Sequence, residues 1–554
     1  MNDLPPELSA LLDAQGADAT RAHRVLGALS NGAWWSPREL VRATAVAHRV
    51  AAGVLDALGA DLERFAASGS EERVRLVRPA RYAEAFDRPR PADAWAPLME
   101  AHPRAAEELR RLVAEAPPSR TDLDHVAATA RTALRRGVFL ADRFDLSGRL
   151  LLCVGDHDLT SLATLLVQPD AEAVVVDVDE RMLASIDAAA DRLGLAIRCH
   201  FADLRLGLPP SVVGACDVVF TDPPYTPEGV ELFVRRGLEG MADPRRGRVA
   251  VAYGVSETTP ALAAKTQARL ARMDLLFEAV HPDFNRYEGA EAIGAASDLY
   301  VLRPLSRAPA GQAGEAARIY SQGGNAKEAA AKRAELAELA GSPALPEPGS
   351  DGGPGTVVGD WPAAQDAAGV RRVRLGTWMS GPVEAGDAVV NLTGGWEALL
   401  GRALLAAGGG GARAVVPSSA PQVRDEAGQR ALAALLGPGV RVRFRRGGPG
   451  SRLVVVEAFP SPVGAGAGPT ERLRARVRER AHGPLPRVLR EAVIAVAAEE
   501  GHSVNKRTAR GLVARAAPWT AGHTLLDLPE HRFADLDQAA ERITAELSEA
   551  APVE

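Results

Sequence analysis

The feature that most constrains the fold is a regular alternation of short apolar runs with amphipathic segments between residues 149 and 253. The apolar runs lie at 149–154, 173–178, 197–201, 217–221 and 247–253. Helical spacing of apolar residues fills the intervals between them, most clearly at 180–193 and 228–240. Strands that alternate with helices of about 10–15 residues indicate a parallel sheet. We therefore predict an α/β fold with a Rossmann-like, methyltransferase-type sheet and an edge pair at 275–280 and 298–302.

Acidic residues gather where these predicted strands end. Asp156 and Asp158 follow the first strand, Asp177 ends the second, and Asp222 follows the fourth. Ligands of open α/β sheets bind at the carboxyl ends of the strands. Because carboxylates are in surplus there, we expect a cationic amine as the substrate. The structural alternative is that Asp158 caps the helix expected from Leu159.

The same edge has features that suit a nucleoside. Gly155 permits close approach of a ligand to the backbone, and Asp177 lies about twenty positions beyond it, where a carboxylate can bind ribose hydroxyls. Asp203 lies where sheets of this kind receive an adenine amino group. Thr160 and Ser161 complete the expected cofactor contacts. No G-x-G-x-x-G motif follows the first strand, which argues against a dinucleotide.

The segment Asp222-Pro223-Pro224-Tyr225 predicts a rigid turn rich in hydrogen-bond acceptors. Its prolines fix the backbone and remove two amide donors, so nearby acceptors stay free for an amine N–H. Tyr225 can stack on the substrate or offer a cation–π face. The catalytic candidates are therefore Asp158, Asp156, Asp222 and Tyr225. Weaker candidates for a second ammonium group are Asp179, Glu228 and Glu231.

Composition divides the chain into six expected parts. These are a winged-helix-like domain (1–92), a helical connector (93–145), the Rossmann-like domain (146–305), a linker rich in Gly, Pro, Ala and Glu (306–357, with an exposed helix at 326–340), a small α/β domain (358–460) and a helical C-terminal region (461–554). A fold of this kind can bind DNA through its third helix, but that helix offers His48, Arg49 and few other polar contacts. A helical cap or dimerisation module is therefore favoured for the first part. The 358–460 segment is interpreted as a degenerate echo of the first sheet. Residues 283–288 are expected either to close over the pocket or to form an ordinary polar connection.

Charge and composition narrow the partners. The net charge of −6 argues against a general nucleic-acid coat. The three cysteines give no disulfide framework, and the eleven histidines show no ligand spacing, so we expect no metal. No apolar run approaches the roughly 20 residues of a membrane span, and the first ten residues lack a signal pattern. We expect a cytoplasmic homodimer without membrane or nucleic-acid partners.

Two motifs carry a resemblance to a known family. Gly155-Asp156-His157-Asp158-Leu159-Thr160-Ser161 and Asp222-Pro223-Pro224-Tyr225-Thr226 resemble the branched-chain polyamine synthases, or N4-bis(aminopropyl)spermidine synthases. Segments 123–125, 135–136 and 284–287 are similar too, and the likeness covers about residues 21–304. It implies transfer of an aminopropyl group from decarboxylated S-adenosylmethionine to a secondary amine of a polyamine, with release of methylthioadenosine.

The resemblance also assigns roles to single residues. Asp156 and Asp158 match the first and last carboxylates of a Gly-Asp-Asp-Asp motif that orients and deprotonates the attacking amine. Asp158 would accept the proton, while Asp156 and Asp222 would position the cation. His157 stands where that motif has its middle aspartate, so one negative charge is missing. Residues 360–554 lie outside the resemblance.

Alternative functions remain at this point. The donor could be intact S-adenosylmethionine, which would pass a methyl or a 3-amino-3-carboxypropyl group to a specialised amine. The Asp-Pro-Pro-Tyr turn beside a winged helix also suits enzymes that methylate amino groups of DNA. In a third alternative, of another class, the chain is a non-catalytic winged-helix regulator that senses an amine.

Overall fold

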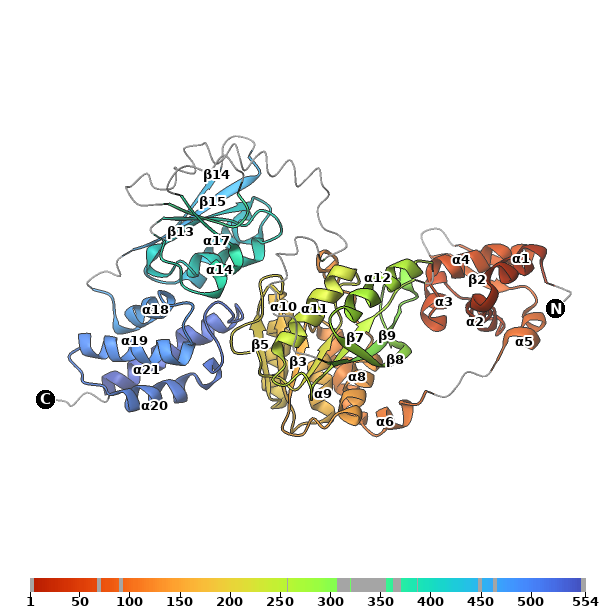
Figure 1. The fold of residues 1–554 in the computed structure, drawn as a ribbon, viewed down its shortest axis with the longest axis horizontal. Coiled ribbons are helices and arrows are strands. Elements are labelled where there is room, and N and C mark those ends of the chain that lie inside the picture. Colours follow the sequence, from red (N-terminus) through yellow and green to blue (C-terminus); the bar gives the residue numbers. More distant parts are fainter. Residues whose placement is uncertain are drawn as a thin grey trace.

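The computed structural model describes residues 4–66, 71–88, 93–256, 258–305, 319, 355–361, 370–385, 387–446, 451–461 and 466–549. Along the chain these form an N-terminal helical module, a first mixed sheet with its helices, a second mixed sheet and a C-terminal helical region (Figure 1). The helix predicted at 326–340 and most of the predicted linker lie outside the described residues.

The first sheet has the order β5-β4-β3-β6-β7-β9-β8 over the described residues. Its strands are β3 (Leu150–Val154), β4 (Glu172–Asp177), β5 (Ile197–Phe201), β6 (Val218–Thr221), β7 (Arg248–Tyr253), β8 (Leu275–Arg286) and β9 (Ala296–Pro304). Neighbours from β5 to β7 are parallel, whereas β9 is antiparallel to both β7 and β8. The predicted parallel sheet with an antiparallel edge pair is therefore confirmed.

Helices cover this sheet and join its strands. They are α9 (Thr160–Val167), α10 (Glu180–Leu193), α11 (Pro227–Gly240) and α12 (Pro260–Ala271), preceded by α6 (Ala96–Glu100), α7 (Pro103–Glu115), the 3-10 turn η3 (Thr121–Leu123) and α8 (Ala130–Arg143). Residues 283–286 belong to β8 rather than to a loop, and residues 287 and 288 follow its end. Phe284 and Asn285 are buried within β8, because that strand runs six residues further than its apolar pattern predicts.

The N-terminal module packs helices against a short hairpin. It contains α1 (Pro6–Gln15), α2 (Ala19–Leu29), α3 (Pro37–Thr44), α4 (His48–Ala57), β1 (Leu62–Phe65), the antiparallel β2 (Arg73–Leu76) and α5 (Pro79–Phe86). A capping box starts α3, because Ser36 and Glu39 bond each other's backbone amides. The module contacts the β8–β9 connection through ion pairs of Arg38 with Glu291 and Arg42 with Glu288.

The second sheet has the order β11-β10-β12-β13-β15-β14 in the part of the chain that the structure describes. Its elements are β10 (Thr356–Val358), β11 (Arg371–Val373), α14 (Leu375–Ser380), β12 (Ala388–Asn391), α15 (Leu400–Leu405), β13 (Ala412–Pro417), α16 (Pro421–Arg424), α17 (Glu426–Leu436), β14 (Val440–Arg446) and β15 (Leu453–Pro460). Strands β11 to β13 are parallel, and β15 is antiparallel to both β13 and β14.

The strand order of the second sheet repeats that of the first sheet without its outer strand β5. Placing β10 on β3 matches β11-β10-β12-β13-β15-β14 with β4-β3-β6-β7-β9-β8 in order and direction. In both sheets the first strand ends at a valine that is followed by Gly and Asp: Val154-Gly155-Asp156 after β3 and Val358-Gly359-Asp360 after β10. Both glycines have positive φ, 73° at Gly155 and 89° at Gly359. The interpretation of this segment as a degenerate echo of the first sheet is confirmed.

The strand register shows which carboxylates of the first sheet have no counterpart in the second. Val154 pairs with Val176 and Thr221, while Val358 pairs with Val373 and Val390. One residue further along each strand, the positions of Asp177 and Asp222 are therefore taken by Arg374 and Asn391. The second sheet keeps the glycine turn but not these two carboxylates.

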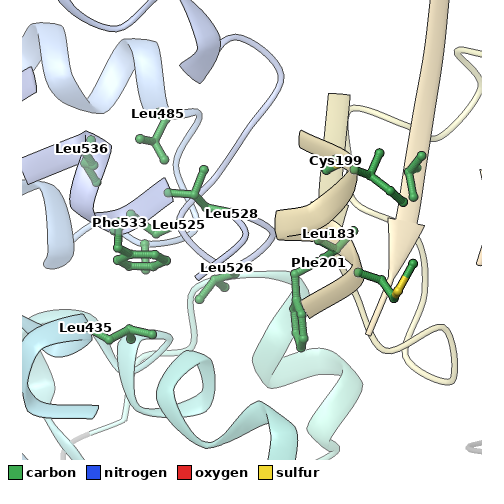
Figure 2. Close-up of a cluster of buried hydrophobic side chains, with 14 of the residues drawn as sticks. Leu183, Cys199, Phe201, Leu435, Leu485, Leu525, Leu526, Leu528, Phe533 and Leu536 are labelled. Atoms are coloured by element: carbon green, nitrogen blue, oxygen red, sulfur yellow. The ribbon is translucent and has the colours of Figure 1, made fainter. Parts of the chain in front are cut away.

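A helical region ends the described chain and joins both sheets. It consists of α18 (Pro469–Arg478), α19 (Leu485–Glu499), α20 (Lys506–Ala516) and α21 (Arg532–Glu549). Figure 2 shows Leu526 and Leu528 of this region beside Phe201 of β5, within one continuous buried cluster. Arg402 of the second sheet's α15 lies over the Phe201 ring, 3.5 Å from its centroid. None of the described helices combines the length and apolar character needed to cross a membrane.

Candidate active site

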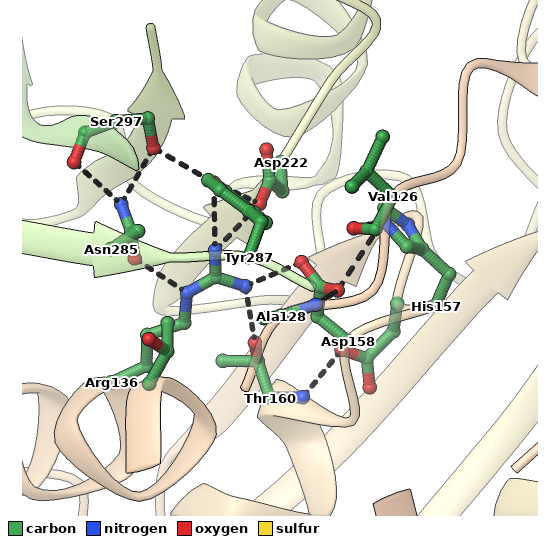
Figure 3. A network of polar contacts seen from close by, with 12 residues as sticks. Val126, Ala128, Arg136, His157, Asp158, Thr160, Asp222, Asn285, Tyr287 and Ser297 are labelled. Carbon is green, nitrogen blue, oxygen red and sulfur yellow. Dashed lines mark hydrogen bonds and ion pairs between the residues drawn. The ribbon is translucent and has the colours of Figure 1, made fainter. Parts of the chain in front are cut away.

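A buried arginine joins the two predicted motifs. Arg136 is 0% exposed, and its Nη1 donates to Asp158 Oδ2 at 2.8 Å while its Nη2 donates to Asp222 Oδ2 at 2.6 Å. Its Nε donates to Asn285 Oδ1 at 2.8 Å. Figure 3 shows the guanidinium fork between the two aspartates, with Asn285 and Tyr287 on its other side. The motifs, from separate strands, thus meet at one cation.

The position of Arg136 follows from close packing of α8 on α9. At Gly137, a Cβ would lie 2.6 Å from the Ala163 carbonyl oxygen, so a larger residue would push the helices apart. The next residue toward the N-terminus, Arg136, therefore points over the carboxyl ends of β3 and β6, where both aspartates lie. The Asp222 and Asp158 carboxylates raise the pKa of Arg136 although burial works against its charge. It stays protonated.

Two tyrosines hold the other side of Asp222. The Tyr225 hydroxyl donates to Asp222 Oδ1 at 3.0 Å, and the Tyr287 hydroxyl donates to Oδ2 at 2.8 Å. The two hydroxyl oxygens are 2.7 Å apart, and Tyr287 also bonds Ser297 at the same distance. Burial raises the Asp222 pKa to about 6, with Arg136 opposing the shift. Asp222 therefore changes charge close to neutral pH.

Asp156 has the capping role that the sequence suggested for Asp158. Its two carboxylate oxygens accept the amides of Thr160 at 2.7 Å and Ser161 at 3.0 Å, at the start of α9. Burial raises its pKa to about 7, although these amides oppose the shift. Asp156 is not among the residues that line the cavities described below. Asp158 instead accepts the Ala128 amide at 2.7 Å, so the cap prediction for Asp158 is wrong.

The predicted ribose carboxylate lies beside the glycine turn. Asp177 Oδ2 accepts the Asp156 amide at 3.0 Å, and Oδ1 accepts the Asp179 amide at 2.9 Å. Gly155 has a φ of +73°, which L side chains rarely adopt, and a Cβ there would lie 3.3 Å from the Phe233 ring, so glycine suits this position. The structure therefore brings Gly155 and Asp177 together, as expected for a ligand that approaches the backbone.

Other candidates already have protein partners. Both Asp203 oxygens accept the Arg205 guanidinium, and Asp179 caps α10 and pairs with Arg181 at 2.6 Å. Glu228 and Glu231 both pair with Arg269. Thr160 and Ser161 are fully buried within α9. The structure does not bring Asp203, Thr160, Ser161, Glu228 or Glu231 to either cavity, and their ligand contacts stay a prediction.

Two cavities lie at this edge of the sheet. The first has a volume of about 140 Å³ and is lined by residues that include Pro118, Asp158, Asp179 and Met182. The second, of about 30 Å³, is lined by residues that include Gly155, Asp177 and Asp222. His125 and His157 line both. Asp158 lines the first cavity and Asp222 lines the second. The expectation that both aspartates face one shared cavity is therefore not met.

The histidine pair forms the wall between these cavities. The His125 and His157 rings are stacked with centroids 4.4 Å apart and planes within 4°. Burial lowers both pKa values, and the neighbouring His157 lowers that of His125 further, to about 4. Both rings are therefore neutral at pH 7. Sequence reasoning missed Arg136 and His125 as site residues, although both lie in segments that carried the family resemblance.

Comparison with known proteins finds one family model that matches the residues of this site. Residues 104–310 match the sequence model of the branched-chain polyamine synthase A C-terminal domain. This part of the chain is therefore similar to that domain. The matched residues contain α8, the first sheet, Arg136 and both aspartate motifs.

Curated relatives match the same part. An uncharacterized protein of Methanocaldococcus jannaschii is 34% identical over 201 residues, which cover 36% of this chain and 50% of that protein. N(4)-bis(aminopropyl)spermidine synthases are 36% identical over 158 residues in Thermus thermophilus (27% of this chain, 46% of that one) and 31% identical over 147 residues in Thermococcus kodakarensis (26% and 42%). The chain spans half or less of the length of these relatives.

One solved structure is also similar. It is the branched-chain polyamine synthase of Thermus thermophilus in complex with N4-aminopropylspermidine and 5'-methylthioadenosine. The TM-score is 0.43 and the identity 26%, over 57% of this chain and 98% of that one.

Proposed function

We propose that this protein transfers an aminopropyl group from decarboxylated S-adenosylmethionine to an amine nitrogen of a polyamine. The observation that carries this proposal is the meeting of Asp158 and Asp222 at the buried Arg136, beside cavities lined by carboxylates and imidazoles. This arrangement lies within the residues that match the family, whose curated relatives include N(4)-bis(aminopropyl)spermidine synthases.

Charge around the cavities supports an amine substrate. Among the described residues that line the two cavities there are carboxylates and histidines but no Lys or Arg. A polyamine carries several ammonium groups, which carboxylates stabilise at short range. Arg136 lies behind the aspartates and keeps them oriented, so its charge does not face the cavities. The remaining lone pairs of Asp158 and Asp222 are available to an N–H group.

The same charge distribution favours the decarboxylated donor. Intact S-adenosylmethionine carries a carboxylate, which protein sites bind through Arg or Lys side chains. The cavity linings offer Asp124, Asp177, Asp179 and Asp222 instead, and these would repel it. We therefore favour decarboxylated S-adenosylmethionine over the alternative of methyl or 3-amino-3-carboxypropyl transfer from the intact molecule.

The reaction we propose is a direct displacement. The amine nitrogen forms a bond to the propyl carbon next to the sulfonium, and the carbon–sulfur bond breaks with its electron pair going to sulfur. Methylthioadenosine leaves as a neutral thioether. The proton on the amine passes to a carboxylate, for which we propose Asp158, with Asp222 holding the cation. Holding nitrogen and carbon near attack distance supplies most of the rate.

Ligand binding requires the histidine wall to move. The cavity beside Gly155 and Asp177, with a volume of about 30 Å³, has room for a water molecule but is too small for a nucleoside. The segment that narrows it is Leu123-Asp124-His125, in which Asp124 has a φ of +56°. We propose that this segment shifts when the donor binds, which joins the two cavities and brings the acceptor near Asp158 to the donor near Asp177.

Incubation of the full chain with spermidine and each donor, followed by mass spectrometry, tests the function. We expect a mass gain of aminopropyl units and release of methylthioadenosine with the decarboxylated donor only. Transfer from the intact donor alone would replace the proposal with the alternative. No transfer from either, with both ligands shown to bind, would favour the non-catalytic sensor.

We propose supporting roles for the remaining parts. Helices α2 to α4 and the β1–β2 hairpin support the winged-helix-like assignment of the first part, and the ion pairs of α3 with the β8–β9 connection favour a packing role over DNA binding. The second sheet has no carboxylates at the positions of Asp177 and Asp222, which favours the interpretation of this sheet as an inactive second lobe. The homodimer stays a prediction.

A further inference from the structure

Outside the candidate active site, two histidines and an aspartate meet where the C-terminal helical region joins β5. They are His200 of β5, and His523 and Asp527 of the segment before α21. All three are buried, at 1%, 6% and 5% exposure. One ligand atom from each lies within 4.8 Å of the others. His200 and Asp527 are 327 positions apart in the chain, so no local spacing pattern indicates a metal site here.

The geometry of these three side chains suits a small metal ion. His200 Nδ1 lies 3.3 Å and His523 Nδ1 lies 3.1 Å from the same oxygen, Asp527 Oδ1. A tetrahedral Zn²⁺ with bonds of about 2.0–2.2 Å keeps its ligand atoms about 3.3–3.5 Å apart. The observed separations are therefore close to those around such an ion.

The surroundings orient the carboxylate toward the histidines. The Thr524 hydroxyl donates to Asp527 Oδ2 at 2.7 Å, and the Thr524 amide donates to both oxygens at 3.1 and 3.2 Å. The Asp527 carbonyl accepts the Phe201 amide at 2.8 Å. Metal ligands are commonly held by such outer hydrogen bonds. Oδ1 is thereby left facing the two imidazoles.

The two imidazoles lie side by side at one carboxylate oxygen. The His200 and His523 rings are 4.1 Å apart between centroids, and the Nδ1 atoms of both lie next to Asp527 Oδ1. Two imidazole nitrogens and one carboxylate oxygen are ligand types that zinc binds in proteins. We propose that His200, His523 and Asp527 bind a divalent transition metal of the zinc class, with water as the fourth ligand, and that this ion ties the C-terminal region to β5.

The same joint provides a matched control. His531 also belongs to the C-terminal region, and it contacts an aspartate of α10 beside the first sheet. Its Nε2 lies 2.8 Å from Asp187 Oδ2. It is not part of the three-residue cluster. His531→Ala therefore removes an imidazole from the same interface without removing a proposed ligand.

The test is metal content and spectroscopy of the full chain. Protein freed of metal by a chelator is titrated with Zn²⁺ and with Co²⁺ at neutral pH, and thermal unfolding is followed with and without Zn²⁺. We expect one equivalent to bind, tetrahedral Co²⁺ absorption to appear, and Tm to rise with Zn²⁺. His523→Ala and Asp527→Asn should lose all three effects, whereas His531→Ala should keep them.

Several outcomes would overturn the proposal. A folded wild-type chain that binds no Zn²⁺ or Co²⁺, or equal binding by wild type and His523→Ala, would show that the cluster is only a hydrogen-bonded contact. If Asp527→Asn fails to fold, the wild-type titration and the His523→Ala variant still decide. Zn²⁺ binding without a rise in Tm would show that the ion does not tie the C-terminal region to β5.

Discussion

The imidazoles of His125 and His157 stack face to face, 4.4 Å apart, and divide the space beside Asp158 and Asp222 into two cavities. His157 occupies the position at which the family motif has an aspartate. A neutral, flat side chain there allows the stack, which a carboxylate would not form. Both cavities of the site are therefore lined by this stacked pair.

Replacing His157 by aspartate should raise the pKa values of the neighbouring carboxylates. The His157 Nε2 lies 3.4 Å from Asp158 Oδ1, so a third carboxylate here would repel its neighbours and raise their pKa values. We expect the acid limb of kcat/KM to move to higher pH and the KM for the polyamine to fall. His157→Asn, which has no charge, is the control. A limb that moves equally in both variants would contradict this explanation.

Activity should fall as the pH drops through about 6. The Asp222 pKa is raised to about 6 by burial, so below that pH the carboxylate is protonated and cannot hold an ammonium group. The rate is therefore retained above this pH and lost below it. Asp222→Asn should abolish the limb and lower kcat/KM, because the amide has no negative charge with which to hold an ammonium group. A pH–rate profile of wild type and variant checks both, and an unchanged limb in Asp222→Asn would assign it to another group.

Arg136→Lys should keep the charge but lose the geometry. A lysine ammonium cannot reproduce the planar fork that reaches Asp158, Asp222 and Asn285 together. Arg136→Met removes the charge as well and leaves two buried carboxylates unpaired, at a cost of about 3–5 kcal/mol. We expect unfolding in denaturant to rank wild type above Lys and Lys above Met. Equal stability of the Lys and Met variants would show that the charge itself contributes little.

Asp156→Asn should separate a structural from a catalytic role. The carboxylate caps α9 by accepting the Thr160 and Ser161 amides with separate oxygens, whereas an asparagine side chain has only one carbonyl oxygen for the two amides. We expect a lower Tm with kcat largely retained. Asp158→Asn should instead lower kcat, because Asp158 is the proposed proton acceptor. A large loss of kcat in Asp156→Asn at unchanged Tm would restore the catalytic role that the sequence suggested.

The sequence predicted elements whose signals are local. The bounds of α10 and β5 match the periodic runs that indicated them, and the strand-end carboxylates Asp158 and Asp222 do meet. Arg136 escaped notice because its role depends on how α8 packs against α9, which no local pattern records. Strands β10 and β11 were missed because each has only three residues, too few for a periodic signal.

The sequence did not reveal the capping role of Asp156 for a related reason. Two aspartates in one motif can both belong to a site, or one of them can serve the helix that follows. Which of them turns toward the α9 amides depends on the positive φ of 73° at Gly155 and of 59° at Leu159. Leucine rarely adopts that conformation, so its effect on the aspartates could not be read from residue types.

Two sheets with one strand order in a single chain create a hazard during folding, since a strand from one can pair into the other. Proteins with internal repeats misassemble in this way. The two sheets differ at their outer strands. The first sheet ends in β5 and β8, whereas the second ends in β11 and β14, and the β14 sequence VRVRFRR carries four arginines. Charged edge strands resist pairing with a foreign neighbour. The arginines of β14 thus help to keep strands of the first sheet from adding to the second while the protein is being made.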